Sequence, residues 1–345
     1  MLEIKGLKVS FHAYSGEVQA VRGVDLTLNE GEILAIVGES GCGKSVTAQS
    51  VLRLHDPKIA QYKEGEILLD GKDILKLSEK EMQGIRGKDI SMIFQDPMTS
   101  LNPTMTVGNQ IIEVLREHEK GKDGKKISRK EALQRAIELL KMVRIPNAEN
   151  RVNEYPHQFS GGQKQRVMIA MAMACSPRIL IADEPTTALD VTVQAQILQL
   201  MKEMQKEKGT SIIIISHDMG AVASIAQKVV VMYGGVVVES GTAEDIFYRH
   251  EHPYTRGLLN SVPKEGQPKD KELDSIEGMP PDLIKPPVGC PFADRCKYAM
   301  QVCKDHAPCE HVLSETHKCS CWLLDPDCPY PRLSLEKLQG AQGKE

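Results

Sequence analysis

The chain has 345 residues, 41% hydrophobic and 26% charged, a composition typical of a soluble globular protein with room for two or three domains. The net charge of −4 gives no overall basic field that would gather nucleic acid or anionic lipid. No apolar run approaches the roughly 20 residues of a membrane helix, and the first residues lack the pattern of a signal peptide, so we expect a cytoplasmic protein.

Six segments are predicted to be strands, because they are apolar or alternating and lie between turn residues: 2–10, 24–28, 32–37, 65–71, 178–183 and 211–216. The last two are continuously apolar, as expected of strands covered on both faces. Residues 193–206, between them, have apolar side chains at helical spacing. The alternation of short strands with longer helical stretches predicts an α/β fold.

Residues 38–45, Gly-Glu-Ser-Gly-Cys-Gly-Lys-Ser, match the phosphate-loop pattern G-x-x-x-x-G-K-[ST], after a strand and before a helical stretch, 46–52. In such a loop backbone N–H groups surround a phosphate, and the following helix adds its positive dipole end. Lys44 would reach the β- and γ-phosphates, and Ser45 would ligate Mg²⁺. The loop alone does not distinguish a kinase, a GTPase and an ATPase. The candidate nucleotide-binding residues here are Gly38, Glu39, Ser40, Gly41, Cys42, Gly43, Lys44, Ser45 and Val46.

A pair of carboxylates, Asp183 and Glu184, follows the apolar run 179–182. Ligands bind at the carboxyl ends of the strands in open α/β sheets. Asp183 suits the ligand shell of Mg²⁺, and Glu184 suits a general base that takes a proton from water. Because the pair occurs together with the phosphate loop, we interpret it as functional.

Residues 159–166, Phe-Ser-Gly-Gly-Gln-Lys-Gln-Arg, begin a predicted helix for which Ser160 is a suitable N-cap. Gly161 and Gly162 would let an anion come close to the positive end of that helix. The segment precedes the strand that leads to Asp183, which favours a role in the same site.

Five motifs thus occur in order: the loop 38–45, Gln95 within Phe-Gln-Asp-Pro, the segment 159–163, the strand 179–184 and His217 within Ser-His-Asp. In this combination the chain resembles the nucleotide-binding subunit of an ABC transporter, and Ala188-Leu-Asp190 is similar to the D-loop of that family. The resemblance implies a P-loop ABC ATPase cassette over residues 1–255, with an antiparallel β subdomain and a helical subdomain over about 96–175.

The resemblance also implies roles. In such ATPases two subunits enclose two ATP molecules, each between the phosphate loop of one subunit and the signature of the other. The signature residues that would serve the partner's nucleotide are Ser160, Gly161, Gly162 and Gln163. Gln95 would ligate Mg²⁺ or position water and would sense the membrane subunits. His217 would contact the γ-phosphate, and Asp190 would link the two sites across the dimer.

The family usually stacks adenine on an aromatic side chain just after the first strand. Phe11 and Tyr14 are the two candidates here. Phe11 fits the strand register better, whereas Tyr14 lies in what reads as a short insertion, and either side chain could instead serve packing alone.

The C-terminal third is unusual in its cysteines, because seven of the nine in the chain lie between Cys290 and Cys328. A proline-rich stretch, 263–287, leads to this region. The segments 252–259 and 289–296 are similar to the C-terminal extension of the dipeptide/oligopeptide import ATPases. We therefore expect a small Cys-rich extension over 256–330 and a flexible tail over 331–345.

Four cysteines fit the pattern of that family: Cys290, Cys296, Cys303 and Cys321. Four thiolates could hold a [4Fe–4S] cluster, which the resemblance implies in some dipeptide-importer subunits. Zinc is an alternative, since three histidines lie nearby, and free thiols are a third. Three cysteines are extra to the pattern: Cys309, Cys319 and Cys328.

The resemblance implies an importer with two membrane permeases, two related ATPase subunits and an external peptide-binding protein. This chain would be the ATP-hydrolysing subunit, peripheral at the cytoplasmic face, with ATP and Mg²⁺ as cofactors. The family favours a sister ATPase as partner, with a homodimer as the alternative. Nickel or oligosaccharide import is the nearer alternative function. A soluble ABC ATPase that acts on nucleic acid is disfavoured by the single cassette and the net charge, so we expect no nucleic-acid partner.

Overall fold

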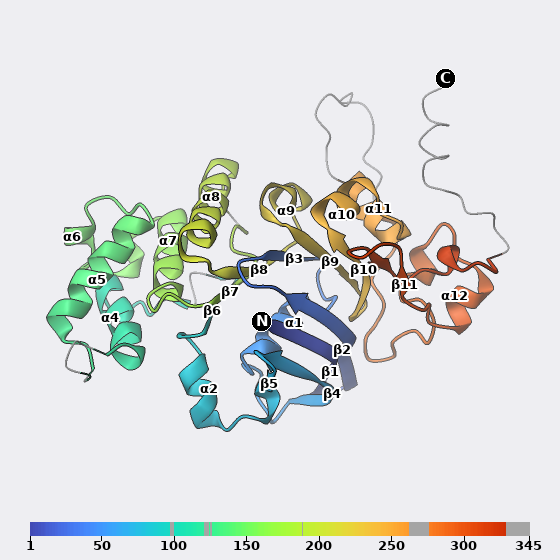
Figure 1. Cartoon of the computed structure of the whole chain (residues 1–345), viewed down its shortest axis with the longest axis horizontal. Helices are drawn as coiled ribbons and strands as arrows, with labels where there is room; N and C mark the ends of the chain where they lie inside the picture. Colours follow the sequence, from blue (N-terminus) through green and yellow to red (C-terminus); the bar gives the residue numbers. More distant parts are fainter. Residues whose placement is uncertain (97–99, 121–123, 125, 188, 262–275, 329–345) are drawn as a thin grey trace, which may run out of the picture.

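The computed structural model describes residues 1–96, 100–120, 124, 126–187, 189–261 and 276–328 (Figure 1). The predicted tail, 331–345, lies outside the described residues, as does Ala188 of the D-loop-like segment. In the described part of the chain, no helix is long and apolar enough to cross a membrane.

The N-terminal region forms a four-stranded antiparallel sheet in the order β2-β1-β4-β5. Its strands are β1 (Leu2–Ala13), β2 (Gly16–Leu28), β4 (Ala60–Leu69) and β5 (Lys72–Asp73). Buried and partly exposed side chains alternate along β1, in the pattern of a sheet with one covered face. The short helices η1 (Ile74–Lys76) and α2 (Glu79–Ile85) follow this sheet in the chain.

The central sheet has eight strands in the order β11-β12-β10-β9-β3-β8-β7-β6. Its strands are β3 (Ile33–Val37), β6 (Ile90–Ile93), β7 (Ile179–Asp183), β8 (Ser211–Ser216), β9 (Lys228–Tyr233), β10 (Val236–Thr242), β11 (His311–Val312) and β12 (Lys318–Cys319). Strands β9, β3, β8, β7 and β6 are parallel, and β3, β6, β7 and β8 are buried along their whole length. The expected α/β fold is confirmed.

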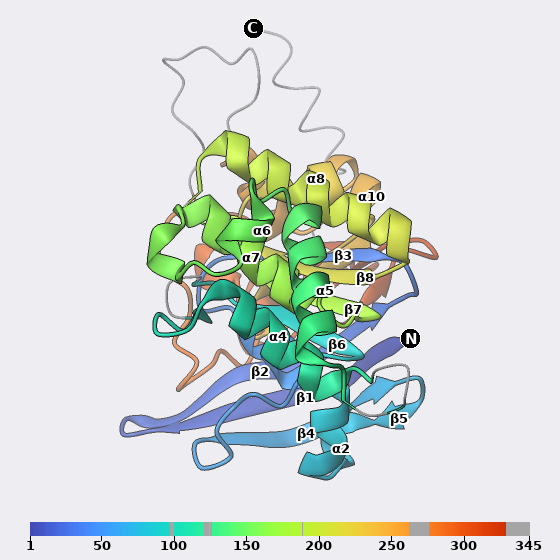
Figure 2. The ribbon, with the colours of Figure 1, turned by 90° about the vertical axis from the view of Figure 1, so that its left-hand side faces the viewer.

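Alternate residues of these parallel strands enter two separate cores. Ile213 and Ile215 of β8 pack with α1 (Lys44–Val51) and the antiparallel sheet. Ile212 and Ile214 pack into the second core, to which α8 (Val191–Lys208) and α9 (Met219–Ile225) contribute. Figure 2 shows the resulting layers, with helices on one side of the central sheet and the antiparallel sheet on the other.

A helical region lies at one end of the molecule (Figure 1). Its helices are α4 (Val107–His118), α5 (Arg129–Met142), α6 (Ala148–Arg151), η2 (Pro156–Gln158) and α7 (Gly161–Ala172). They pack tightly: a Cβ on Gly108 of α4 would lie 2.5 Å from the carbonyl oxygen of Val152. Gln95 precedes this region and the signature residues open its last helix.

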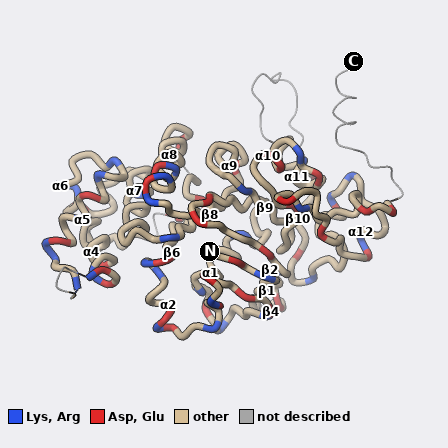
Figure 3. The backbone as a smooth tube through the Cα atoms, viewed as in Figure 1, with Lys and Arg blue, Asp and Glu red and all other residues tan. Residues whose placement is uncertain are grey.

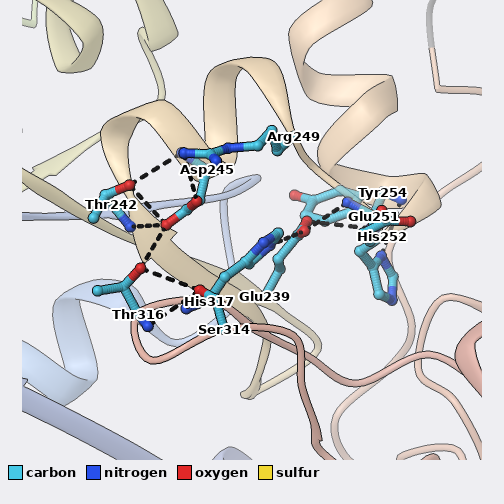
Figure 4. A network of polar contacts seen from close by, with 10 residues as sticks. All are labelled: Glu239, Thr242, Asp245, Arg249, Glu251, His252, Tyr254, Ser314, Thr316 and His317. Atoms are coloured by element: carbon cyan, nitrogen blue, oxygen red, sulfur yellow. Dashed lines mark hydrogen bonds and ion pairs between the residues drawn. The ribbon is translucent and has the colours of Figure 1, made fainter. Parts of the chain in front are cut away.

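The C-terminal part continues the central sheet, because β12 pairs with β10. Its helices are α10 (Ala243–Tyr248), α11 (Pro253–Asn260), η3 (Ala293–Arg295), α12 (Gln301–Asp305) and η4 (Trp322–Leu324). A buried polar network links β10 to the residue before β12. The Glu239 carboxylate lies 2.9 Å from His317 Nε2 and accepts hydrogen bonds from the backbone N–H groups of Glu251 and His252 (Figure 4). The boundaries expected at 255 and 330 remain predictions.

Candidate nucleotide-binding site

The phosphate loop connects β3, in the middle of the central sheet, to α1. Two of its glycines are required by space as well as by their positive φ angles. A Cβ on Gly38 would lie 2.2 Å from the Met232 carbonyl oxygen, and one on Gly43 would lie 2.4 Å from that of Ala20. The loop is therefore pressed against the neighbouring strands, with the N-terminus of α1 at its end.

Lys44 is the first residue of α1 and is only 5% exposed. Its Nζ donates 2.8 Å hydrogen bonds to the carbonyl oxygens of Gly38 and Glu39, so the ammonium group lies over its own loop. A buried cation at the start of a helix is a suitable partner for a phosphate group.

Ser45 and Asp183 meet although they lie far apart in the chain. The Ser45 hydroxyl donates a 2.8 Å hydrogen bond to Asp183 Oδ1, at the carboxyl ends of β3 and β7. Burial, with the nearby Glu184 charge in addition, raises the pKa of Asp183 above its usual value. The pair thus offers two oxygen ligands beside the phosphate loop.

Glu184 is the centre of a second group. Its φ of +48° lies in the left-handed region that few non-glycine residues adopt, and its N–H donates to the Ile215 carbonyl at 3.0 Å. One carboxylate oxygen accepts from the Gln95 amide at 3.1 Å, and the other lies 3.4 Å from His217 Nδ1. Three of the predicted residues are therefore in contact.

Thr187 is a further member of this group that the sequence analysis missed. Its hydroxyl donates a 2.9 Å hydrogen bond to Glu184, within the turn that follows β7. The only sequence signal is its position three residues after Glu184, which is the spacing of a turn contact.

The signature residues form the N-terminus of α7. Ser160 caps the helix by accepting from the Gln163 N–H, and the Gln163 side chain accepts from the Ser160 N–H in return. A Cβ on Gly162 would lie 2.8 Å from Val193 of α8, so glycine is needed there. Gly161 has open space at its Cβ position. The described contacts of the signature are with α7 and α8, and its expected role at a second subunit's nucleotide stays a prediction.

Asp190 is the N-cap of α8, where its carboxylate accepts from the Val193 N–H at 2.9 Å. Its predicted role across a dimer remains untested. Of the two adenine candidates, Phe11 is partly buried in β1 and makes an edge-on contact with His55 at 5.1 Å, whereas Tyr14 is fully exposed in the turn after β1. The choice between them also stays a prediction.

The predicted [4Fe–4S] cluster is wrong. The four cysteines do line one small cavity of about 10 Å³, together with Phe292 and Trp322. However, among the described residues no group of three or more Cys, His, Asp or Glu side chains is placed to hold a metal ion, and each described cysteine is a free thiol. The zinc alternative has no support for the same reason.

The physical reason is burial. It raises the pKa of Cys290 to about 11 and that of Cys321 to about 12, because apolar surroundings disfavour the charged thiolate. Cys290 and Cys303 belong to the buried core, where a thiol packs as a small apolar group. Spacing alone located the four residues near one another but did not reveal their chemistry.

Three features define a nucleotide-binding domain of the ABC type. They are a phosphate loop after a central parallel strand, carboxylates at the end of the next strand but one, and a capped Ser-Gly-Gly-Gln helix. The sequence matches the family described as ABC transporter over residues 21–187. It also matches the family described as oligopeptide/dipeptide transporter, C-terminal region, over residues 238–303.

Two relatives are from Bacillus subtilis (strain 168). The chain is 57% identical over 329 residues to the oligopeptide transport ATP-binding protein OppD, covering 95% of this chain and 90% of that protein. It is 54% identical to the dipeptide transport ATP-binding protein DppD, covering 97% and 98%. The chain belongs to the ABC transporter ATP-binding proteins, in the branch that serves oligopeptide and dipeptide transport. The family expected from the sequence is confirmed.

Solved structures agree with this assignment. A dimeric structure of a bacterial ABC transporter cassette matches with a TM-score of 0.63 at 30% identity, covering 70% of this chain and 99% of that chain. The structure of cbiO1 from Clostridium perfringens, part of the ABC transporter complex cbiONQ, matches with a TM-score of 0.59 at 32% identity, covering 71% and 90%. The expected cassette fold is confirmed.

Proposed function

We propose that this chain binds Mg·ATP at the phosphate loop and hydrolyses it with Glu184 as general base, in a site that a second, related subunit completes. Membership of the family makes the chain an ATPase coupled to peptide transport, and nickel or oligosaccharide import is not favoured. One observation carries the proposal: five predicted residues gather in two adjoining contact groups at neighbouring strand ends, namely Ser45, Asp183, Gln95, Glu184 and His217.

The loop supplies the phosphate contacts. Its backbone N–H groups and the N-terminus of α1 attract the triphosphate, and Lys44 brings a positive charge to the β- and γ-phosphates. The two confined glycines keep side chains out of this space. Preorganised charge of this kind stabilises the negative charge that develops as the γ-phosphoryl group transfers.

Mg²⁺ fits the residues beside the loop. The Ser45 hydroxyl and the Asp183 carboxylate are hard oxygen ligands 2.8 Å apart, the type that Mg²⁺ prefers. Gln95, which contacts the adjacent Glu184, carries a further amide oxygen. When bound, Mg²⁺ would neutralise charge on the β- and γ-phosphate oxygens.

Glu184 takes a proton from the attacking water. The contacts with Gln95, Thr187 and His217 fix its carboxylate, and its unusual backbone angle sets the direction of the side chain. The His217 side chain is 60% exposed, which leaves its ring accessible to a γ-phosphate. Gln95 holds the same carboxylate and therefore controls the position of the base.

A second ATPase subunit places its signature over the nucleotide, and this chain's signature, 160–163, serves the nucleotide of that subunit. Support comes from the open space at Gly161 and from the capped N-terminus of α7. Asp190 lies beside the signature through Val193, so it is suited to communicate between the two sites. We favour a sister chain as the partner, with a homodimer as the alternative.

The membrane permeases contact the helical region. A hollow of about 330 Å³ there is lined by residues from the segment after Gln95, from α4 and from α7, among them Ser100, Gln110, Glu117, His118 and Met171. A permease segment in this hollow would act on Gln95 and hence on Glu184.

The subunit is peripheral at the cytoplasmic face, and the peptide-binding protein acts through the complex. Figure 3 shows acidic and basic residues interspersed along the described elements. This mixture argues against a basic surface that would bind nucleic acid.

Co-expression with the sister ATPase and the two permeases tests this proposal. The expected result is a complex that hydrolyses ATP faster when peptide-loaded binding protein is added and that accumulates peptide in vesicles. A chain that purifies with nucleic acid instead, or whose turnover does not respond to the binding protein, would contradict it.

A further inference from the structure

The C-terminal part of the chain contacts the phosphate loop through an ion pair. Glu39, the second residue of the loop, forms a bidentate ion pair with Arg295, which lies 256 positions later in η3. The two nitrogen–oxygen distances are 2.5 and 3.1 Å. The Arg295 side chain is 6% exposed and that of Glu39 is 25% exposed, so the pair is largely shielded from water.

The guanidinium group is held on every side. Besides Glu39, it donates to the Tyr233 hydroxyl at 3.0 Å and to the backbone carbonyls of Ile276 and Glu277 at 3.0 and 2.8 Å. These contacts use all five N–H donors that arginine has. A lysine has only three donors and no planar fork, so it could not replace the arrangement.

A second contact fixes the loop backbone at the same residue. The Glu39 N–H donates a 2.8 Å hydrogen bond to the hydroxyl of Tyr254, which is fully buried in α11. The Tyr254 ring packs on Tyr233 at 4.5 Å and on Phe292 at 5.3 Å. Both the side chain and the backbone of Glu39 are therefore bound to one cluster that joins the cassette to residues 276–295.

The turn after β9 completes this cluster. The Gly235 N–H donates to the carbonyl of Cys42 in the phosphate loop at 3.2 Å. A Cβ on Gly234 would lie 2.8 Å from Pro291, so the turn is pressed between the loop and the C-terminal part. Movement of residues 291–295 would thus reach the phosphate loop in two ways, through the contacts of Glu39 and through the turn after β9.

We propose that Arg295 is a positioning residue of the phosphate loop, through which the C-terminal extension sets the affinity of the site for ATP. The proposal rests on the proposed function. Arg295 neutralises the Glu39 carboxylate, which would otherwise repel the triphosphate beside it. It also holds the loop in one shape, which lowers the ordering cost of nucleotide binding.

The test uses the assembled importer with Arg295→Met, which keeps the apolar volume and removes the charge. We expect the KM and the dissociation constant for Mg·ATP to rise about 10-fold with kcat changed less than about twofold, because the ground state and the transition state lose the same binding energy. Arg295→Lys should give an intermediate rise. The matched control is Arg178→Met, since Arg178 forms an exposed bidentate pair with Asp70 far from the loop in the chain.

A double variant separates charge from folding effects. Adding Glu39→Gln to Arg295→Met removes the unpaired carboxylate and should recover part of the lost ATP affinity. Should Arg295→Met fail to assemble, Arg295→Lys serves in its place and should still raise the KM. An unchanged KM in these variants would overturn the proposal. So would variants that have a lower melting temperature and a lower kcat but the same KM as the control variant. If the unsubstituted importer itself binds no ATP, the proposed function fails instead.

Discussion

The Gln95 amide donates a 3.1 Å hydrogen bond to the Glu184 carboxylate, and so ties the segment that enters the helical region to the residue that we assign as general base. Gln95 follows β6 and Glu184 follows β7, which are neighbouring parallel strands. Displacement of Gln95 would therefore release one of the contacts that orient the carboxylate. We propose this contact as the route by which a membrane subunit would influence hydrolysis.

Gln95→Ala should uncouple hydrolysis from transport. We expect the turnover stimulated by the binding protein to fall about 10-fold or more, because Glu184 loses a hydrogen bond that orients it, while ATP affinity changes little. ATPase assays of the importer in vesicles, with and without loaded binding protein, measure this. Gln199→Ala is the control, since Gln199 also donates to a glutamate, at 3.1 Å, but on the exposed side of α8. Equal stimulation in both variants would contradict the route.

Ser45→Ala should raise the Mg²⁺ requirement. Loss of a direct oxygen ligand is expected to increase the Mg²⁺ concentration for half-maximal hydrolysis about 10-fold or more. A titration of ATPase rate against Mg²⁺ measures the change. Ser50→Ala, in the same helix, removes a buried hydroxyl that donates to the Val46 carbonyl and should leave the titration unchanged. If the two variants titrate alike, Ser45 is not a ligand.

His252 should make stability depend on pH between about 6.5 and 4. Burial lowers the pKa of this histidine to about 4, whereas it titrates near 6.5 when unfolded. The unfolded chain therefore binds a proton that the folded chain does not in this window, so stability falls as the pH falls. The loss is up to about 3 kcal/mol by the time the folded pKa is reached.

Melting temperatures of the unsubstituted chain and of His252→Asn, measured from pH 8 to pH 4.5, test this. Asparagine keeps a side chain that caps α11, where His252 Nδ1 accepts from the Tyr254 N–H at 3.0 Å. We expect a shallower pH slope in the variant. Glu239 does not account for the effect. Although burial alone would raise its pKa, hydrogen bonds from His317 and from the Glu251 N–H hold the pKa below its usual value, so its stabilising effect is lost only at lower pH. Equal slopes would show that His252 is not the source.

The sequence was sufficient where function depends on local patterns. The phosphate loop, the carboxylates Asp183 and Glu184 and the capped helix at Ser160 each occupy a few consecutive residues whose spacing sets the geometry, and the strands that carry the first two are recognisable from apolar runs. The contact of Ser45 with Asp183 follows from the rule that ligands gather at the carboxyl ends of parallel strands.

The remainder depends on packing that no local pattern encodes. The pairing of Glu39 with Arg295 joins segments 256 positions apart, and no spacing rule predicts it. The cysteines show the opposite failure: their proximity was expected, but burial in an apolar cavity keeps thiols such as Cys321 protonated, and spacing does not report burial.

Glu184→Gln in the assembled importer tests the central claim most directly, with ATP turnover and ATP binding measured on the same preparation. The amide keeps the size of the side chain but cannot take a proton from water, so turnover should fall by about 100-fold or more while the ATP dissociation constant stays within about twofold. Glu203→Gln, at a surface glutamate paired with Arg144, should leave both unchanged. Turnover in Glu184→Gln equal to that of the unsubstituted importer would contradict the assignment of Glu184 as the general base.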